Sequence, residues 1–236
     1  AIAFAHRRLA IVDLSDAGHQ PMISPSQRYV ITFNGEIYNH IDLREQLESG
    51  GLGQTNWQGH SDTETLIAGI ETWGLEKTPS KSIGMFAFAL WDRQKKELYI
   101  ARDRIGEKPL YYGCQQGVFL FGSELKALTA HPAFKGEVDR NAITLLLRHN
   151  YIPTPYAIYK DIRKLPPGTF LKLPVLGDKY SVSKLSEPKT YWSLESAISK
   201  GSEEAFDGSD SDAVGALDSL LRTSVAQQMV ADVPLG

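Results

Sequence analysis

The feature that most constrains the fold of this chain is a series of closely spaced apolar runs between residues 84 and 122. The runs are Met85 to Trp91, Glu97 to Ala101, Pro109 to Gly113 and Val118 to Phe121. Runs of this length, bounded by turn-forming residues, predict β-strands. Because connections this short can join only antiparallel neighbours, the sequence predicts an antiparallel sheet at its centre.

Further elements flank this central sheet. Ala1 to Val12 has a strand-like mixture of apolar and polar residues, and Tyr29 to Phe33 predicts a strand that ends in a turn at Asn34-Gly35. Thr169 to Leu173 predicts the last strand. Strands and helices that fall in separate blocks, without strict alternation, indicate an α+β class up to about residue 177.

Helix signals are clearest at three places. Ser61-Asp62-Thr63-Glu64 is a capping box that should begin a helix ending near Gly74. Asp139 is expected to cap a second helix, which runs to about Arg148. A third, amphipathic helix is predicted near the end of the chain from its apolar positions Val214, Leu217, Leu221, Val225 and Met229.

The composition changes after about residue 177. Residues 199–212 are rich in Ser, Gly, Asp and Glu, which is typical of a solvated linker. We therefore expect one domain over residues 1–177, a linker over 178–210, and the start of a second domain over 211–236. The chain opens on Ala1 without a methionine and stops just after a helical pattern, so we expect a piece of a longer protein.

Composition excludes several classes of protein. The 236 residues carry a net charge of −3, which argues against a nucleic-acid partner. The longest apolar run, residues 83–91, is about half the length of a membrane-spanning helix, so no membrane partner is expected. One cysteine allows no internal disulfide, which fits a reducing, cytoplasmic location.

The sequence gives little support for a metal site or a phosphate-binding loop. The six histidines and Cys114 show no metal-ligand spacing, and no glycine-rich phosphate loop is present, so we predict no metal site. Cys114 has no histidine nearby in the sequence. It is interpreted as a small half-buried residue rather than a nucleophile.

Three other places could carry chemistry. The Gly35 amide and the Asn34 side chain are two donors that could form an oxyanion hole, and the alternative is an ordinary turn. Arg8 could clamp a substrate carboxylate, or it could be a surface arginine. Asp62 could hold a substrate ammonium, or it could stabilise a helix N-terminus.

The order and text of the motifs are more specific than any one of them. The chain resembles the glutaminase half of glutamine-dependent asparagine synthetases. The matching segments are residues 5–13 (AHRRLAIVD), 20–22 (QPM), 33–39 (FNGEIYN), 61–64 (SDTE), 84–92 (GMFAFALWD), 101–112 (ARDRIGEKPLYY), 123–128 (SELKAL), 166–169 (PPGT) and 224–236.

This resemblance implies a class II glutamine amidotransferase domain of the N-terminal-nucleophile hydrolase fold, an αββα sandwich of two antiparallel sheets. The first helix of an α/β ATP-pyrophosphatase domain would follow it. In the implied site, the strand Arg8, Leu9, Ala10, Ile11 and Val12 binds L-glutamine, with Arg8 on its α-carboxylate. Asn34 and Gly35 are the oxyanion donors, Glu36 belongs to the same binding turn, and Asp62 receives the α-ammonium.

The resemblance also implies a reaction for the longer protein. Glutamine would be hydrolysed to glutamate and ammonia, and the ammonia would amidate aspartate to asparagine at the expense of ATP, with Mg²⁺. None of the ATP loop lies in this sequence, so we assign no cofactor to the chain itself. A homodimer is left open.

One departure concerns the nucleophile. The family uses an N-terminal cysteine, whereas residue 1 is alanine. We therefore expect the chain as given to be inactive in glutamine hydrolysis, and residues 1–12 to be poorly supported by neighbouring strands. Two alternatives stay open: a relative that amidates another carboxylate, such as a sugar acid, and a non-catalytic binding module of the same fold.

Overall fold

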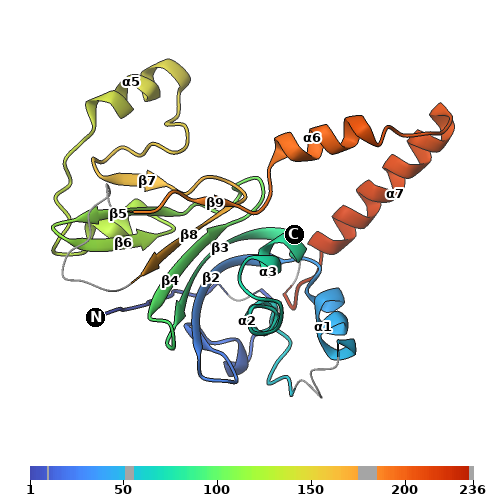
Figure 1. Ribbon diagram of the computed structural model, residues 1–236, viewed down its shortest axis with the longest axis horizontal. Helices are drawn as coiled ribbons and strands as arrows, with labels where there is room; N and C mark the ends of the chain where they lie inside the picture. The colour runs from blue at the N-terminus through green and yellow to red at the C-terminus, as the bar shows by residue number, and fades with distance from the viewer. Residues whose placement is uncertain (10, 51–55, 175–184, 234–236) are drawn as a thin grey trace.

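Two antiparallel sheets form the centre of the molecule (Figure 1). The computed structural model describes residues 1–9, 11–50, 56–174 and 185–233. The larger sheet has six strands in the order β1 (Met22–Ile23), β2 (Tyr29–Ile37), β3 (Gly84–Asp92), β4 (Glu97–Arg102), β8 (Thr169–Pro174) and β9 (Lys189–Thr190). The smaller sheet has three, in the order β6 (Val118–Gly122), β5 (Tyr111–Gln115) and β7 (Ile162–Lys164).

Helices cover the outer faces of both sheets. On the larger sheet lie α1 (His40–Ser49), α2 (Asp62–Trp73) and α3 (Lys77–Lys81). On the smaller sheet, α4 (Leu125–Thr129) packs against β6, and α5 (Arg140–His149) lies farther out. A short 3-10 helix, η1 (Asp16–Gly18), precedes β1. This order of layers confirms the predicted αββα sandwich.

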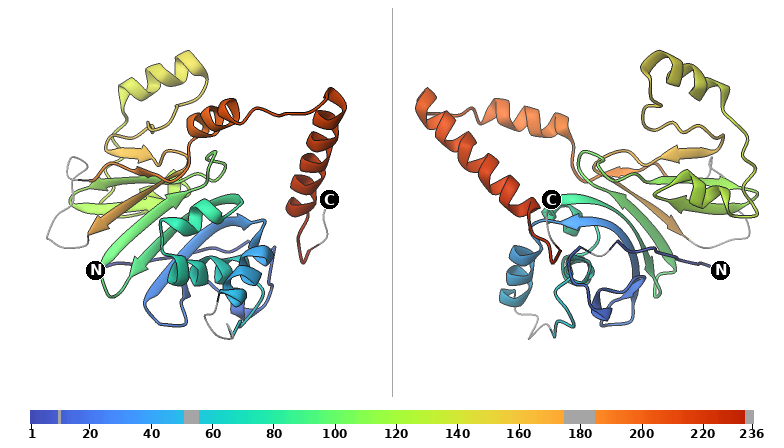
Figure 2. Two further views of the ribbon diagram at one scale, coloured as in Figure 1. Left: turned by 45° about the vertical axis from the view of Figure 1, so that its right-hand side comes forward. Right: turned by 180° about the vertical axis from the view of Figure 1, so that it is seen from behind.

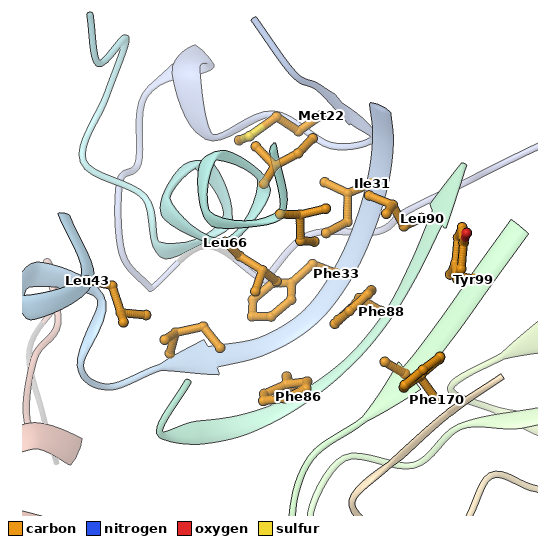
Figure 3. Packing of buried hydrophobic residues seen from close by; sticks show 14 residues of the cluster. Met22, Ile31, Phe33, Leu43, Leu66, Phe86, Phe88, Leu90, Tyr99 and Phe170 are labelled. Carbon is orange, nitrogen blue, oxygen red and sulfur yellow. The ribbon is translucent and has the colours of Figure 1, made fainter. Parts of the chain in front are cut away.

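Strand β3 explains why its sequence is apolar without interruption. Phe86, Phe88 and Leu90 face α2 and belong to the helix-side core, whereas Ala87 and Ala89 face the second sheet. A strand buried on both faces loses the polar alternation of a half-exposed strand. Figure 3 shows the helix-side core, in which the phenylalanines of β2 and β3 lie beneath α2.

The predicted turn at Asn34-Gly35 is wrong. β2 continues through both residues to Ile37, and Asn34 pairs with Ala87 while Gly35 pairs with Phe86. Glycine is needed at position 35 for space rather than for turn geometry. A Cβ built there would lie 2.2 Å from the carbonyl oxygen of Met85 and 2.6 Å from the Cα of Phe86.

Gly35→Ala is therefore expected to force β2 and β3 apart. Such overpacking should cost about 2–3 kcal/mol, a fall in Tm of about 5–10 °C for a chain of this size. Gly215→Ala is the matched control, since no atom lies within 4 Å of a Cβ at that exposed position of α7. Thermal unfolding followed by circular dichroism decides, and equal Tm values for the two variants would contradict the close approach of β2 and β3.

The strand expected over residues 1–12 is also absent from the described residues. Residues 1–9 have no regular secondary structure. Phe4, His6 and Arg8 are half-buried, whereas their neighbours are exposed. The segment is thus extended along the sandwich, which accounts for its strand-like alternation, but no described strand pairs with it. This agrees with the expected weak support of this end.

The helix signals are largely confirmed. Ser61 Oγ accepts the amide of Glu64 at 3.2 Å at the start of α2, although the Glu64 carboxylate accepts the amides of Gln58 and Gly59 instead of completing the capping box. Asp139 caps α5 through the amide of Asn141. The structure thus supports both predicted helix starts.

The C-terminal part contains more structure than a linker. Within the segment predicted as linker, Lys189–Thr190 forms β9 and Leu194–Glu203 forms α6, while residues 178–184 lie outside the described residues. The predicted last helix is α7 (Asp210–Gln228), and both α6 and α7 extend away from the sandwich (Figure 2). The domain boundaries themselves stay a prediction. No helix in the described part of the chain is both long and apolar enough to cross a membrane.

Candidate functional site

A cavity of about 1120 Å³ between the two sheets brings together most of the predicted site residues. Ala10 is outside the described residues, and Leu9 borders the cavity although its side chain is 84% exposed. Of the predicted residues, the following line the cavity: Arg8, Leu9, Ile11, Val12, Asn34, Gly35, Glu36 and Asp62. Residues that are up to 54 positions apart in the sequence therefore share one space.

The backbone of β2 determines where the Gly35 amide points. Phe86, which lies opposite Gly35, directs both its backbone groups toward Asp103. The amide of Asp103 donates to the carbonyl oxygen of Phe86 at 2.8 Å, and the amide of Phe86 donates to Asp103 Oδ2. Gly35 and Phe86 are therefore a non-hydrogen-bonded pair of the antiparallel ladder. The amide of Gly35 consequently points to the edge of β2 away from β3.

The amides on either side of Gly35 confirm this direction. The amide of Phe33 donates to Gln20 Oε1 at 2.7 Å, and the amide of Ile37 donates to Asp62 Oδ2 at 2.9 Å. β1 covers β2 only at Val30 and Ile31, so the Gly35 amide lies beyond the paired part of that edge. Its position at the cavity wall makes it available to a ligand oxygen.

The Asn34 side chain is held in place by a residue that the sequence did not single out. Asn34 Nδ2 donates to Ser123 Oγ at 3.0 Å, across the space between the sheets, and Ser123 lines the same cavity. A carboxamide nitrogen carries two hydrogens, so one remains for a ligand. The only signal for Ser123 in the sequence was its place in the motif Ser123-Glu124-Leu125-Lys126.

Two carboxyl groups give the cavity an acidic end. Asp62, at the start of α2, is buried, and its burial raises its pKa despite the hydrogen bond from the Ile37 amide. Burial also raises the pKa of Glu36; the charge of Asp62 adds to the rise, and Lys108 opposes it. Raised carboxyl pKa values mean that the ionised pair lacks sufficient positive charge around it. A cation placed between them would relieve this cost.

Arg8 is the cationic counterpart of this acidic end. Its Nη2 donates to the carbonyl oxygens of Val12 and Asp13, which folds the guanidinium back against its own segment. The guanidinium also fills the space beside Gly18, where a Cβ would lie 2.3 Å from Nη2. Because a guanidinium has five N–H donors, Arg8 keeps further donors for a ligand besides these two bonds.

Two polar contacts that support the site were not predicted. Gln20 is buried and bridges β2 to α2, because its Nε2 donates to Thr63 Oγ1 at 3.3 Å while its Oε1 holds the Phe33 amide. Asp13 accepts from Ser15 and from the amide of His60. Both residues lie within sequence motifs, residues 5–13 and 20–22, but Thr63, Phe33 and His60, with which they bond, are distant along the chain.

Cys114 lies in β5 and is buried, more completely than the half-buried position expected from its sequence context. Burial raises the pKa of its thiol to about 11. The thiol is therefore protonated at neutral pH and is a poor nucleophile. Among the described residues there is also no cluster of three or more His, Cys, Asp or Glu side chains that could hold a metal ion.

Comparison with known proteins identifies the family. The profile of the glutamine amidotransferase domain matches residues 1–192. The chain belongs to the glutamine amidotransferase domain family. This confirms the family resemblance, and the match of the amidotransferase domain ends just after β9, the last strand of the larger sheet.

Several curated proteins are similar to this amidotransferase domain. Asparagine synthetase [glutamine-hydrolyzing] 3 of Bacillus subtilis is 37% identical over 240 residues, which cover 99% of this chain and 35% of that protein. A putative asparagine synthetase [glutamine-hydrolyzing] of Mycobacterium tuberculosis is 32% identical, over 100% of this chain and 35% of that protein. Amidase chyE of Penicillium rubens is 32% identical, over 99% of this chain and 32% of that protein. The chain spans about a third of the length of these relatives.

A solved structure confirms the fold of the amidotransferase domain. Glutamine phosphoribosylpyrophosphate amidotransferase from B. subtilis superposes with a TM-score of 0.53 at 21% identity, covering 79% of this chain and 34% of that one. At this identity the likeness establishes the shared sandwich fold.

Proposed function

We propose that the cavity between the sheets binds L-glutamine and that this domain supplies the glutaminase site of an amidotransferase. The observation that carries the proposal is the pairing, in one cavity, of a cationic group with two carboxyl groups of raised pKa. A free amino acid is a zwitterion, and this arrangement offers a partner to each of its charges. Membership of the glutamine amidotransferase domain family supports glutamine as that amino acid.

The two charged ends would orient the substrate. Arg8 would receive the α-carboxylate through donors not used by Val12 and Asp13, with the segment Leu9 to Val12 as the wall beside it. Asp62, supported by Glu36, would receive the α-ammonium, which supplies the positive charge that these carboxyl groups lack. Fixing both ends leaves the side-chain carboxamide in a defined direction, and such positioning accounts for a large part of enzymatic acceleration.

Asn34 and Gly35 are proposed as the donors to the carboxamide oxygen. When a nucleophile adds to the carboxamide carbon, negative charge develops on that oxygen. The Gly35 amide at the edge of β2 and the second hydrogen of Asn34 Nδ2 could stabilise it. Ser123 would act by positioning, since it holds the Asn34 side chain before the substrate arrives.

The attacking group itself has no candidate among the 236 residues. Cys114 is the only thiol, it is buried in β5, and its α-nitrogen is committed to the peptide chain. We therefore propose that the polypeptide Ala1 to Gly236 binds glutamine without hydrolysing it.

For the longer protein, the similarity to asparagine synthetases supports glutamine hydrolysis coupled to amidation of aspartate with ATP and Mg²⁺. No residue of this chain is assigned to aspartate, ATP or Mg²⁺. The second candidate is amidation of another carboxylate acceptor by the longer protein. Assay of the full-length protein for asparagine formation from aspartate, ATP and glutamine separates the two. A cytoplasmic location and a homodimer stay part of the proposal.

The test of the proposed function is calorimetric titration of the 236-residue chain with L-glutamine, with ammonia release followed in parallel. We expect saturable binding and no ammonia release above the uncatalysed rate. D-glutamine is the control ligand, because inversion at the α-carbon prevents its carboxylate and ammonium from reaching both partners at once. Equal heats for the two enantiomers would contradict the site, and turnover at an enzymatic rate would contradict the missing nucleophile.

A further inference from the structure

The segment that follows α7 is attached to the sandwich by hydrogen bonds of one residue, Asp232. Residues of α6 and α7 are exposed almost throughout, and α7 lies apart from the sandwich until the chain returns at its end (Figure 2). Among the described residues from Ser193 to Val233, Asp232 alone makes hydrogen bonds to the sandwich. The attachment is therefore local: it is confined to the short stretch around Asp232, where Val230, Ala231 and Val233 are also half-buried.

Asp232 makes three contacts with two distant segments. Its amide donates to the carbonyl oxygen of Ile11 at 2.9 Å, and its Oδ2 accepts the amide of Asp13 at 2.7 Å. The same oxygen lies 2.6 Å from His60 Nε2. The hydrogen bond with His60, and secondarily that from the Asp13 amide, hold the pKa of Asp232 below its usual range, so a charged carboxylate is favoured here.

The segment that Asp232 holds is the one that carries Arg8. Arg8 Nη2 donates to the carbonyl oxygens of Val12 and Asp13, and the Asp13 carboxylate accepts the amide of His60. Asp232, Asp13 and Arg8 thus form one chain of contacts that ends at the cavity. Residues 1–9 have no ladder partner, and contacts such as the packing of Phe4 on Phe121 and that of His6 on Thr32 lie on the side of Arg8 away from Asp13.

We propose that Asp232 is a positioning residue for the segment Arg8–Asp13, and that it couples attachment of the C-terminal end of α7 to glutamine binding. The glutamine part of this inference rests on the proposed function. When Asp232 is hydrogen-bonded to Ile11, Asp13 and His60, the segment Arg8–Asp13 is already ordered before the ligand arrives. The entropy cost of ordering this segment then no longer opposes ligand binding. Because coupling is reciprocal, glutamine in turn strengthens the attachment of the C-terminal end.

The test compares Asp232→Ala with Asp207→Ala in the full chain. Asp207 is an exposed acid between α6 and α7, so its removal matches the change of charge. We expect Asp232→Ala to speed hydrogen exchange at the Asp13 amide about tenfold without ligand, and to raise the glutamine Kd about three- to tenfold. Tm should stay the same, since the exposed α7 contributes little to the core. Asp232→Asn, which keeps an acceptor oxygen, should be intermediate.

The reciprocal measurement uses the unaltered chain. Saturating L-glutamine should slow exchange at the Asp232 amide by a factor comparable to the loss of affinity in Asp232→Ala. Unchanged exchange at Asp13 in Asp232→Ala would overturn the attachment, and faster exchange with an unchanged Kd would overturn the positioning role. If the unaltered chain binds no glutamine, the proposed function fails, and the exchange comparison at Asp13 alone then decides whether Asp232 holds this segment.

Discussion

Arg8→Ala should weaken glutamine binding by about 10- to 150-fold, the range expected when charge-assisted hydrogen bonds of about 1.5–3 kcal/mol are lost. Two effects act in the same direction. The guanidinium is the proposed partner of the substrate carboxylate, and it also ties the carbonyl groups of Val12 and Asp13 together. Arg8→Lys should recover part of the affinity, because an ammonium keeps the charge but lacks the bidentate fork. Isothermal titration calorimetry measures the glutamine Kd of the unaltered chain, of Arg8→Ala and of Arg8→Lys.

Arg7→Ala is the strict control for this prediction. Arg7 is one residue away, borders the same cavity and carries the same charge, but its side chain is exposed. If Arg8 acts by direct contact, Arg7→Ala should change the Kd by less than about threefold, the effect of a screened surface charge. Equal losses in the two variants would instead indicate general attraction of an anion. Unaltered affinity in a folded Arg8→Ala chain would remove Arg8 from the site.

Asp62→Asn should raise stability and abolish binding at the same time. The buried carboxylate pays for desolvation, and burial is the main reason that its pKa is raised. Asparagine keeps an oxygen to accept the Ile37 amide but carries no charge. We expect a gain of about 1 kcal/mol near neutral pH, or 2–4 °C in Tm, and a rise in the glutamine Kd of at least about 100-fold, because the substrate ammonium loses its buried partner.

The pH dependence of stability gives an independent check on Asp62. A carboxyl group whose folded pKa is raised contributes stability that is fully present below its unfolded pKa of about 3.9 and is lost as pH rises through the folded value. The pKa of Glu36 shifts in the same direction. Tm measured from pH 4 to pH 8 should therefore fall less in Asp62→Asn than in the unaltered chain. Glutamine affinity should fall as the pH is lowered, since only ionised carboxylates pair with the ammonium.

Asp42→Asn is the matched control for Asp62. Asp42 lies in the first turn of α1, as Asp62 does in α2, but its side chain is exposed. Removing its charge should lower stability by about 0.3–1 kcal/mol through the helix dipole, opposite in sign to Asp62→Asn, and leave the Kd unaltered. Undiminished glutamine affinity in Asp62→Asn would exclude Asp62 as the ammonium partner.

The parts of the fold that could be predicted are those set by local pattern. The apolar runs of β3 to β6 correctly predicted antiparallel pairing, although they suggested one sheet where the structure has β3 and β4 in the larger sheet and β5 and β6 in the smaller. Ser61 and Asp139 marked helix starts that the structure confirms. The error at Asn34-Gly35 arose because this dipeptide is typical of turns. β3 approaches β2 so closely that only glycine fits at position 35 of the strand. This approach depends on the tertiary structure, and the residues around position 35 do not indicate it.

The candidate site was predicted from motifs, and what was missed are the contacts that hold it. Ser123 is 89 positions from Asn34, and Asp232 is 219 positions from Asp13. No periodicity or spacing rule connects residues so far apart, because their proximity is decided by how the two sheets and the C-terminal end come together. A sequence motif can suggest which groups contact a substrate, whereas the residues that position those groups come from the folded chain.

The two faces of β3 also bear on how such a site could change its ligand. Phe86 and Phe88 fill one face, while the middle of the opposite face, between Met85 and Trp91, carries the methyl groups of Ala87 and Ala89, both of which border the cavity. The room for a ligand is therefore created partly by atoms that are absent from β3. Exchange of Ala89, which pairs with Thr32 rather than with a site residue, for a larger residue would narrow the cavity without replacing Arg8, Asn34 or Asp62. The size of the ligand can then be altered separately from the groups that recognise its charges.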